Sequence, residues 1–160
     1  MCDSQLAHAE LNALLELKLS TAEIHSHTIY TTLEPCPLCM GAIYMSGVRT
    51  LYYASPDTYA GSTDLLGKTW YLAHKPIQVF GPFYGGLAEL GCALHVDYIL
   101  RLPRPGPMDK NAVVEANRAS FPPGVELGEK LYGTGAAQGW AKAGVDAAKM
   151  FELFQDLAAA

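Results

Sequence analysis

Apolar and polar residues along this chain fall into blocks with helical spacing and blocks with strand-like composition. Residues 4–19 repeat apolar side chains at helical spacing, which predicts a helix. Residues 27–33 are rich in β-branched and aromatic residues and predict a strand, which Pro35 ends. Residues 36–46 are expected to form the next helix, and Gly47 is expected to stop it.

The alternation of helix and strand signals continues further along the chain. Residues 50–54 and 77–80 predict two more strands, separated by a loop segment, and residues 87–101 predict a helix. Helices that alternate with strands are typical of an α/β domain. We therefore expect parallel pairing wherever a helix connects two strands.

The composition changes after this helix. The run Pro-Arg-Pro-Gly-Pro at residues 103–107 predicts a rigid, non-helical connector. A mixed tail follows, and residues 140–157 predict a terminal helix. We therefore divide the chain into a domain at residues 1–102 and a helical C-terminal extension at residues 103–160.

Length and composition narrow the class of protein. Half of the 160 residues are hydrophobic, which is enough for one domain with its own core. The net charge is −5, and the 11 Lys and Arg residues are spread thinly, which disfavours a nucleic-acid partner. The sequence shows neither a secretory signal nor an apolar run long enough for a membrane span, so we expect a cytoplasmic protein without a membrane partner.

His8-Ala9-Glu10 and Pro35-Cys36-Pro37-Leu38-Cys39 contain the candidate metal ligands. Catalytic zinc sites use three nitrogen or sulfur ligands and keep a fourth position for water. His8, Cys36 and Cys39 supply one nitrogen and two sulfurs. The C-x-x-C spacing places both thiols near a helix N-terminus, where the helix dipole favours the thiolate. We therefore predict that these three residues bind Zn²⁺.

Glu10 is the candidate catalytic residue, because it lies two positions after His8 and should reach zinc-activated water without binding the metal. Its carboxylate can take a proton from that water and deliver it to a ring nitrogen and then to a departing amine. The H-x-E…P-C-x-x-C pattern is similar to the signature of zinc-dependent nucleobase deaminases, which implies the hydrolytic deamination of an amino-substituted ring, with release of ammonia. We therefore expect an enzyme, a zinc-dependent hydrolase.

A purely structural zinc site is the alternative, and it needs a fourth protein ligand. Cys2, His25 and His27 are donors for such a site, although none of them has a recognisable ligand spacing.

Residues 31–43, T-T-L-E-P-C-P-L-C-M-G-A-I, resemble the tRNA-adenosine-deaminase and guanine-deaminase branch of the cytidine/deoxycytidylate deaminase superfamily. Residues 57–61 are similar to the D-x-x-A/T-G segment of that branch. The resemblance implies that His8, Cys36 and Cys39 are zinc ligands and that Glu10 shuttles protons. It also implies a cytidine-deaminase-like three-layer αβα sandwich with a mixed sheet, and a homodimer or larger homo-oligomer.

This chain differs from the family pattern at its front, because only seven residues precede His8. Family members usually carry a longer segment there, with a helix and a hairpin that contribute groups to the base pocket. We therefore expect the first helix and the hairpin to be missing, and we assign no substrate-binding residue.

Three functions remain open from the sequence. The first is deamination of a small nucleobase, nucleoside or nucleotide, which the low basic content favours. The second is tRNA adenosine-to-inosine editing, with tRNA as the partner. The third is an inactive zinc-binding remnant of a deaminase.

Overall fold

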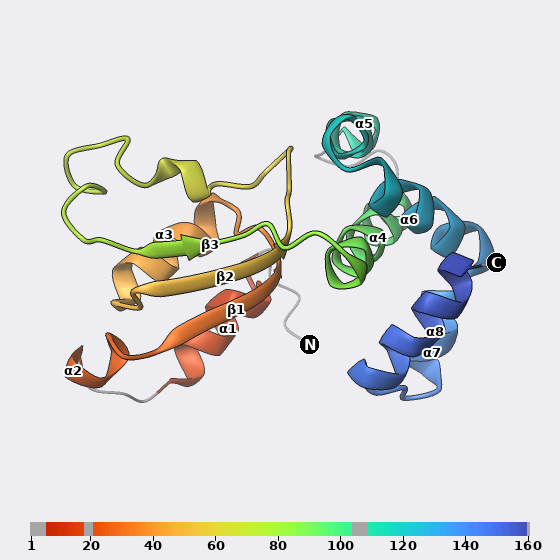
Figure 1. The fold of residues 1–160 in the computed structure, drawn as a ribbon, viewed down its shortest axis with the longest axis horizontal. Coiled ribbons are helices and arrows are strands. Elements are labelled where there is room, and N and C mark those ends of the chain that lie inside the picture. Colours follow the sequence, from red (N-terminus) through yellow and green to blue (C-terminus); the bar gives the residue numbers. More distant parts are fainter. Residues whose placement is uncertain (1–5, 18–20, 104–108, 160) are drawn as a thin grey trace. The chain divides into compact units, whose positions relative to one another are not determined.

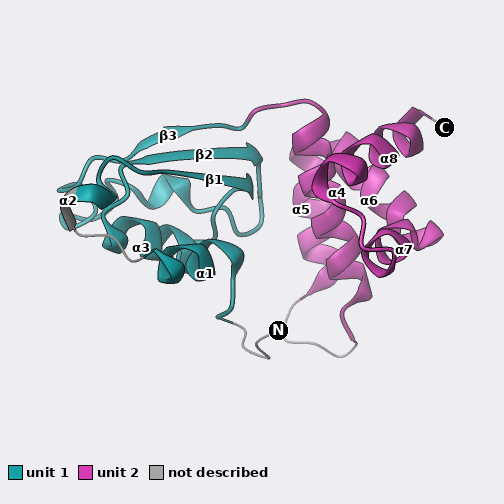
Figure 2. Cartoon of the chain, turned by 90° about the horizontal axis from the view of Figure 1, so that it is seen from below, with its two compact units in different colours: residues 1–82 teal, residues 83–160 magenta. Residues whose placement is uncertain are grey.

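The computed structural model describes residues 6–17, 21–103 and 109–159. The chain divides into two compact units, residues 1–82 and residues 83–160 (Figure 2). The predicted domain boundary was at residue 102. In the structure the helix before this point packs against a later helix, and it is therefore grouped with the second unit.

The first unit contains a sheet of three strands and several short helices (Figure 1). Its elements, in chain order, are α1 (Ala9–Glu16), α2 (Thr21–Ile24), β1 (Thr28–Leu33), α3 (Pro37–Ser46), β2 (Thr50–Ser55), the 3₁₀ helix η1 (Thr63–Leu65) and β3 (Gln78–Phe80).

The sheet has the order β1-β2-β3, and both strand pairs are parallel. The α/β class is therefore confirmed, whereas the mixed sheet is not found among the described strands. The strands are parallel because each connection returns the chain to the same end of the sheet. Helix α3 connects β1 to β2, and a long loop with η1 connects β2 to β3.

One face of this sheet packs against helices α1 and α3 (Figure 2). Ile29, Leu51 and Val79 are aligned across the three strands and join a core that includes Met40 and Ile43 of α3. Strand side chains alternate between faces, so the next aligned residues lie on the opposite face. These are Tyr30, Tyr52 and Phe80, which stack with ring centroids 5.0 and 4.6 Å apart. The second helical layer of the predicted sandwich remains a prediction for this unit.

The described secondary-structure elements of the second unit are all helices. Its helices are α4 (Gly86–Arg101), α5 (Lys110–Ser120), α6 (Pro122–Thr134), α7 (Ala136–Lys142) and α8 (Ala147–Ala159). The closest packing is between α4 and α6, where Gly124 and Gly128 face Cys92 and Val96. None of the described helices is both long and apolar enough to cross a membrane.

Candidate metal centre

The two segments that carry the candidate ligands meet at the N-terminal ends of α1 and α3. His8 is the N-cap residue of α1 and Cys36 is the N-cap residue of α3, and both have extended backbone angles. Pro37 occupies the first turn of α3, where a missing N–H does not disrupt helical hydrogen bonds. Cys39 follows within that first turn, so both thiols lie where the helix dipole favours negative charge.

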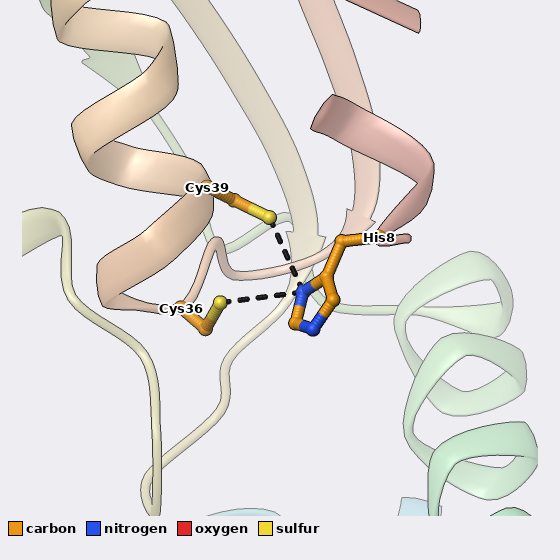
Figure 3. A group of neighbouring side chains, drawn as sticks. All are labelled: His8, Cys36 and Cys39. Atoms are coloured by element: carbon orange, nitrogen blue, oxygen red, sulfur yellow. Dashed lines mark hydrogen bonds between the residues drawn. The ribbon is translucent and has the colours of Figure 1, made fainter. Parts of the chain in front are cut away.

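His8, Cys36 and Cys39 converge on one point (Figure 3). The Nδ1 atom of His8 lies 3.4 Å from the Sγ atom of Cys36 and 3.3 Å from the Sγ atom of Cys39. All three donor atoms lie within 4.8 Å of one another.

The two nitrogen–sulfur distances fit a tetrahedral zinc ion. Zinc bonds of about 2.0 Å to nitrogen and about 2.3 Å to sulfur would separate neighbouring nitrogen and sulfur ligands by roughly 3.5 Å. The structure therefore brings the donor atoms of the three predicted ligand residues together. They form a site that could hold a metal ion.

Glu10 lies beside this group, in the first turn of α1. Its Oε2 atom accepts a hydrogen bond from the Cys39 thiol at 3.4 Å. Its Oε1 atom accepts a hydrogen bond from the Thr31 hydroxyl at 3.0 Å. The carboxylate is thus held between the metal-binding group and strand β1.

Burial raises the proton affinity of the Cys39 sulfur. Cys39 is 1% exposed, and burial, with a smaller contribution from the nearby Glu10 carboxylate, raises the pKa of its thiol. A bound cation acts in the opposite direction, because it stabilises the thiolate. Metal binding at this centre is therefore expected to release a proton from Cys39.

Glu34 holds a neighbouring loop against the Cys36 turn. Its carboxylate accepts hydrogen bonds from the backbone N–H of Asp57 at 3.4 Å and from the backbone N–H of Thr63 at 3.2 Å. The Thr63 hydroxyl also donates to it, at 2.5 Å. Ser62 continues the attachment by donating its N–H to the Pro35 carbonyl at 3.0 Å. The segment between β2 and η1 is thereby joined to the residue that precedes the first sulfur ligand.

The alternative of a fourth protein ligand gains no support from the described residues. The His25 ring nitrogen Nδ1 hydrogen-bonds the Gly47 carbonyl at 2.7 Å, and the His27 Nδ1 atom hydrogen-bonds the Glu23 carbonyl at 2.9 Å. Among the described residues, the metal-binding group contains only His8, Cys36 and Cys39. Cys2 lies outside the described residues.

Sequence reasoning missed the contacts of Thr31 and Glu34, although both residues lie in the run that carries the family resemblance. Alternation along β1 was the available signal for Thr31, because it places this side chain on the same face as the core residue Ile29. No comparable local signal pointed to Glu34, whose partners are more than 20 positions away.

Comparison with known proteins finds a family match in this part of the chain. Residues 2–55 match the family model of the cytidine and deoxycytidylate deaminase zinc-binding region. These residues are similar to that region of the deaminase family. The match confirms the predicted resemblance and contains all four predicted site residues, from His8 to Cys39.

Several curated deaminases are similar to this part of the chain. A probable cytosine deaminase of Schizosaccharomyces pombe is 32% identical over 91 residues, which cover 48% of this chain and 54% of that protein. The tRNA-specific adenosine deaminase of Bacillus subtilis is 36% identical over 63 residues, which cover 38% of this chain and 39% of that protein. The deoxycytidylate deaminase of Enterobacteria phage T2 is 46% identical over 52 residues, which cover 32% of this chain and 27% of that protein.

The chain therefore spans about half, or less, of the length of these curated relatives. No solved structure matches it.

Proposed function

We propose that this chain is a zinc-dependent deaminase that acts on a small nucleobase, nucleoside or nucleotide. The observation that carries the proposal is the convergence of the His8 nitrogen and the Cys36 and Cys39 sulfurs, with the Glu10 carboxylate beside them.

The residues of the centre have distinct roles in this proposal. His8, Cys36 and Cys39 hold the metal, and zinc, when bound, supplies a Lewis acid that makes water nucleophilic near neutral pH. Glu10 accepts a proton from water as the water oxygen bonds to the ring carbon that carries the amino group. Glu10 gives this proton to the adjacent ring nitrogen. It then takes the second proton of the former water from the new hydroxyl group and gives it to the departing nitrogen. A C–O bond forms, the C–N bond breaks, and the amino nitrogen leaves as ammonia.

Charge favours a small substrate. The chain has a net charge of −5, and phosphate contacts from Lys and Arg dominate the affinity of nucleic-acid-binding proteins. The similarity to tRNA-specific adenosine deaminases makes tRNA the second candidate substrate.

The test is ammonia release from cytosine, cytidine, deoxycytidylate, guanine, adenosine and an anticodon stem-loop. We expect turnover of at least one small compound by protein that holds about one zinc per chain. Glu10→Gln should lower kcat by about 10²- to 10⁴-fold, because it removes the proton carrier and leaves all three ligands.

Metal analysis of both proteins is the control, since the variant should keep its zinc. Turnover of the stem-loop alone would select the tRNA candidate. A zinc-loaded chain that releases ammonia from none of the substrates would contradict the proposal and favour an inactive remnant.

A further inference from the structure

We propose that Thr31 is a positioning residue that holds the Glu10 carboxylate in its working orientation. This inference rests on the proposed deaminase function, in which Glu10 carries the proton.

The contact geometry assigns the Thr31 proton to Glu10. The Thr31 Oγ1 atom lies 3.0 Å from the Oε1 atom of Glu10 and 2.9 Å from the carbonyl oxygen of Leu33. A hydroxyl carries one proton, so it donates to one acceptor at a time. The carboxylate is the stronger acceptor because it is charged. The Leu33 carbonyl offers a second position for the same proton, close enough to be used without moving the side chain.

Both oxygens of Glu10 are therefore engaged, and each points in a different direction. Oε1 is bound to strand β1 through Thr31, and Oε2 lies next to the Cys39 sulfur. A carboxylate fixed at one oxygen keeps its second oxygen aimed at the metal-binding group.

The position of the Thr31 hydroxyl is set by the sheet. Thr31 is half-buried on β1, where it is aligned with Tyr53 of β2. Its β-branched side chain has few accessible rotamers. Glu10, in contrast, is on α1, a helix of eight residues without a fully buried side chain. The hydrogen bond thus connects helix α1, which is weakly anchored, to strand β1. It does so at the Glu10 carboxylate, whose orientation decides whether it can transfer a proton.

Loss of the hydroxyl should reduce the chemical step more than binding. A hydrogen bond to a charged group is strong enough that its loss from Thr31→Val should lower kcat roughly 10- to 100-fold. KM and the zinc content should not change, because Thr31 is not a ligand of the metal. Thr31→Ser keeps the hydroxyl and should restore kcat.

The experiment compares Thr31→Val, Thr31→Ser and the matched control Thr32→Val in the full chain. Thr32 is the next residue of β1, is exposed, and points to the opposite face of the sheet. Kinetics with the small substrate found in the ammonia assay are one readout. The second is the ¹³C carboxyl resonance of Glu10 at constant pH, assigned by its absence in Glu10→Gln.

The proposal predicts that Thr31→Val shifts or broadens the Glu10 resonance and lowers kcat, while Thr31→Ser and Thr32→Val leave both near the wild-type values. A Glu10 resonance that Thr31→Val does not move would overturn it. So would a Thr31→Ser variant as impaired as Thr31→Val. If Thr31→Val fails to fold, Thr31→Ser decides by itself: a wild-type Glu10 resonance supports the proposal and a shifted one overturns it.

The resonance does not depend on turnover. A chain that is inactive towards every compound would refute the proposed function, and the Thr31 contact would still be decided independently.

Discussion

At the scale of single residues, the candidate centre depends on close packing around the Glu34 carboxylate as well as on the ligands. Gly61 lies where any larger residue would collide, because a Cβ atom there would sit 2.4 Å from the Asp57 carbonyl and 2.4 Å from the Glu34 Oε2 atom. The glycine therefore permits the loop to approach the carboxylate that holds it.

Replacing Gly61 should consequently weaken the fold. We expect Gly61→Ala to lower the free energy of unfolding by about 1–3 kcal/mol, because the backbone must shift to admit the methyl group. Gly41→Ala is the control, since Gly41 lies in α3 with open space around its Cβ position. That variant should be more stable than the wild type by about 0.5–1 kcal/mol. Urea unfolding measures both, and equal stabilities would contradict the role assigned to Gly61.

Residue spacing predicted which residues form the candidate metal-binding group. It did not predict which neighbouring residues contact that group. The spacing of Cys36 and Cys39, with Pro37 between them, is a local pattern, so their place at the start of α3 could be anticipated. The contacts of Thr31 with Glu10 and of Glu34 with Thr63 join positions that are far apart in sequence. Such contacts follow from how α1, β1 and the loop meet in space, and no periodicity encodes them.

At the scale of elements, the predicted helix boundaries match the observed ones where proline or glycine marks the end of a helix. The helix predicted at residues 36–46 is observed at Pro37–Ser46, because proline begins it and Gly47, with a φ of 101°, ends it. The helix predicted at residues 4–19 is shorter, at Ala9–Glu16, since the extended backbone of His8 ends it on the N-terminal side. Apolar spacing alone does not mark that limit.

In residues 103–160, local sequence signals are a poor guide to where helices begin and end. Consecutive prolines such as Pro122 and Pro123 are usually read as a break, yet here they form the first turn of α6, where proline is tolerated. The helix predicted at residues 140–157 is divided into α7 and α8, with Gly144 between them at a φ of 66°. Glycine in this left-handed conformation ends a helix, and the sequence pattern alone did not reveal it.

The contact between α4 and α6 gives a prediction at this scale. A Cβ atom at Gly128 would lie 2.6 Å from the Cβ atom of Val96, whereas one at Gly133 of the same helix would meet nothing within 4 Å. Gly128→Ala should therefore separate the helices and lower the thermal stability by an amount equivalent to about 1–3 kcal/mol. Gly133→Ala should show no such loss in the same calorimetric experiment. A Gly128→Ala variant as stable as Gly133→Ala would show that this crossing is looser than the structure indicates.

At the scale of the whole molecule, the candidate site residues and the longest helices lie in different units. The four site residues and the family match at residues 2–55 fall within the first unit, and α4 to α8 belong to the second. Each unit has its own apolar core: Leu51 belongs to that of the first, and Val96 to that of the second.

Removal of zinc should therefore act on one unit. We expect a chelator to speed amide hydrogen exchange in α1 and at the start of α3, because metal binding and local order are linked. Exchange in α4 and α6 should stay the same, since their core contains no metal ligand. Exchange mass spectrometry with and without chelator measures this, and equal acceleration in both units would contradict the prediction.

The small helix α1 has a consequence for how activity would be lost. It carries the His8 imidazole at its N-cap and the Glu10 carboxylate in its first turn, and no side chain of the helix itself is fully buried. If the ion departs, His8 loses its metal anchor, and the Thr31 hydrogen bond remains to hold Glu10. Starvation for zinc would then reduce the number of competent molecules, while each molecule that remains loaded works at its full rate.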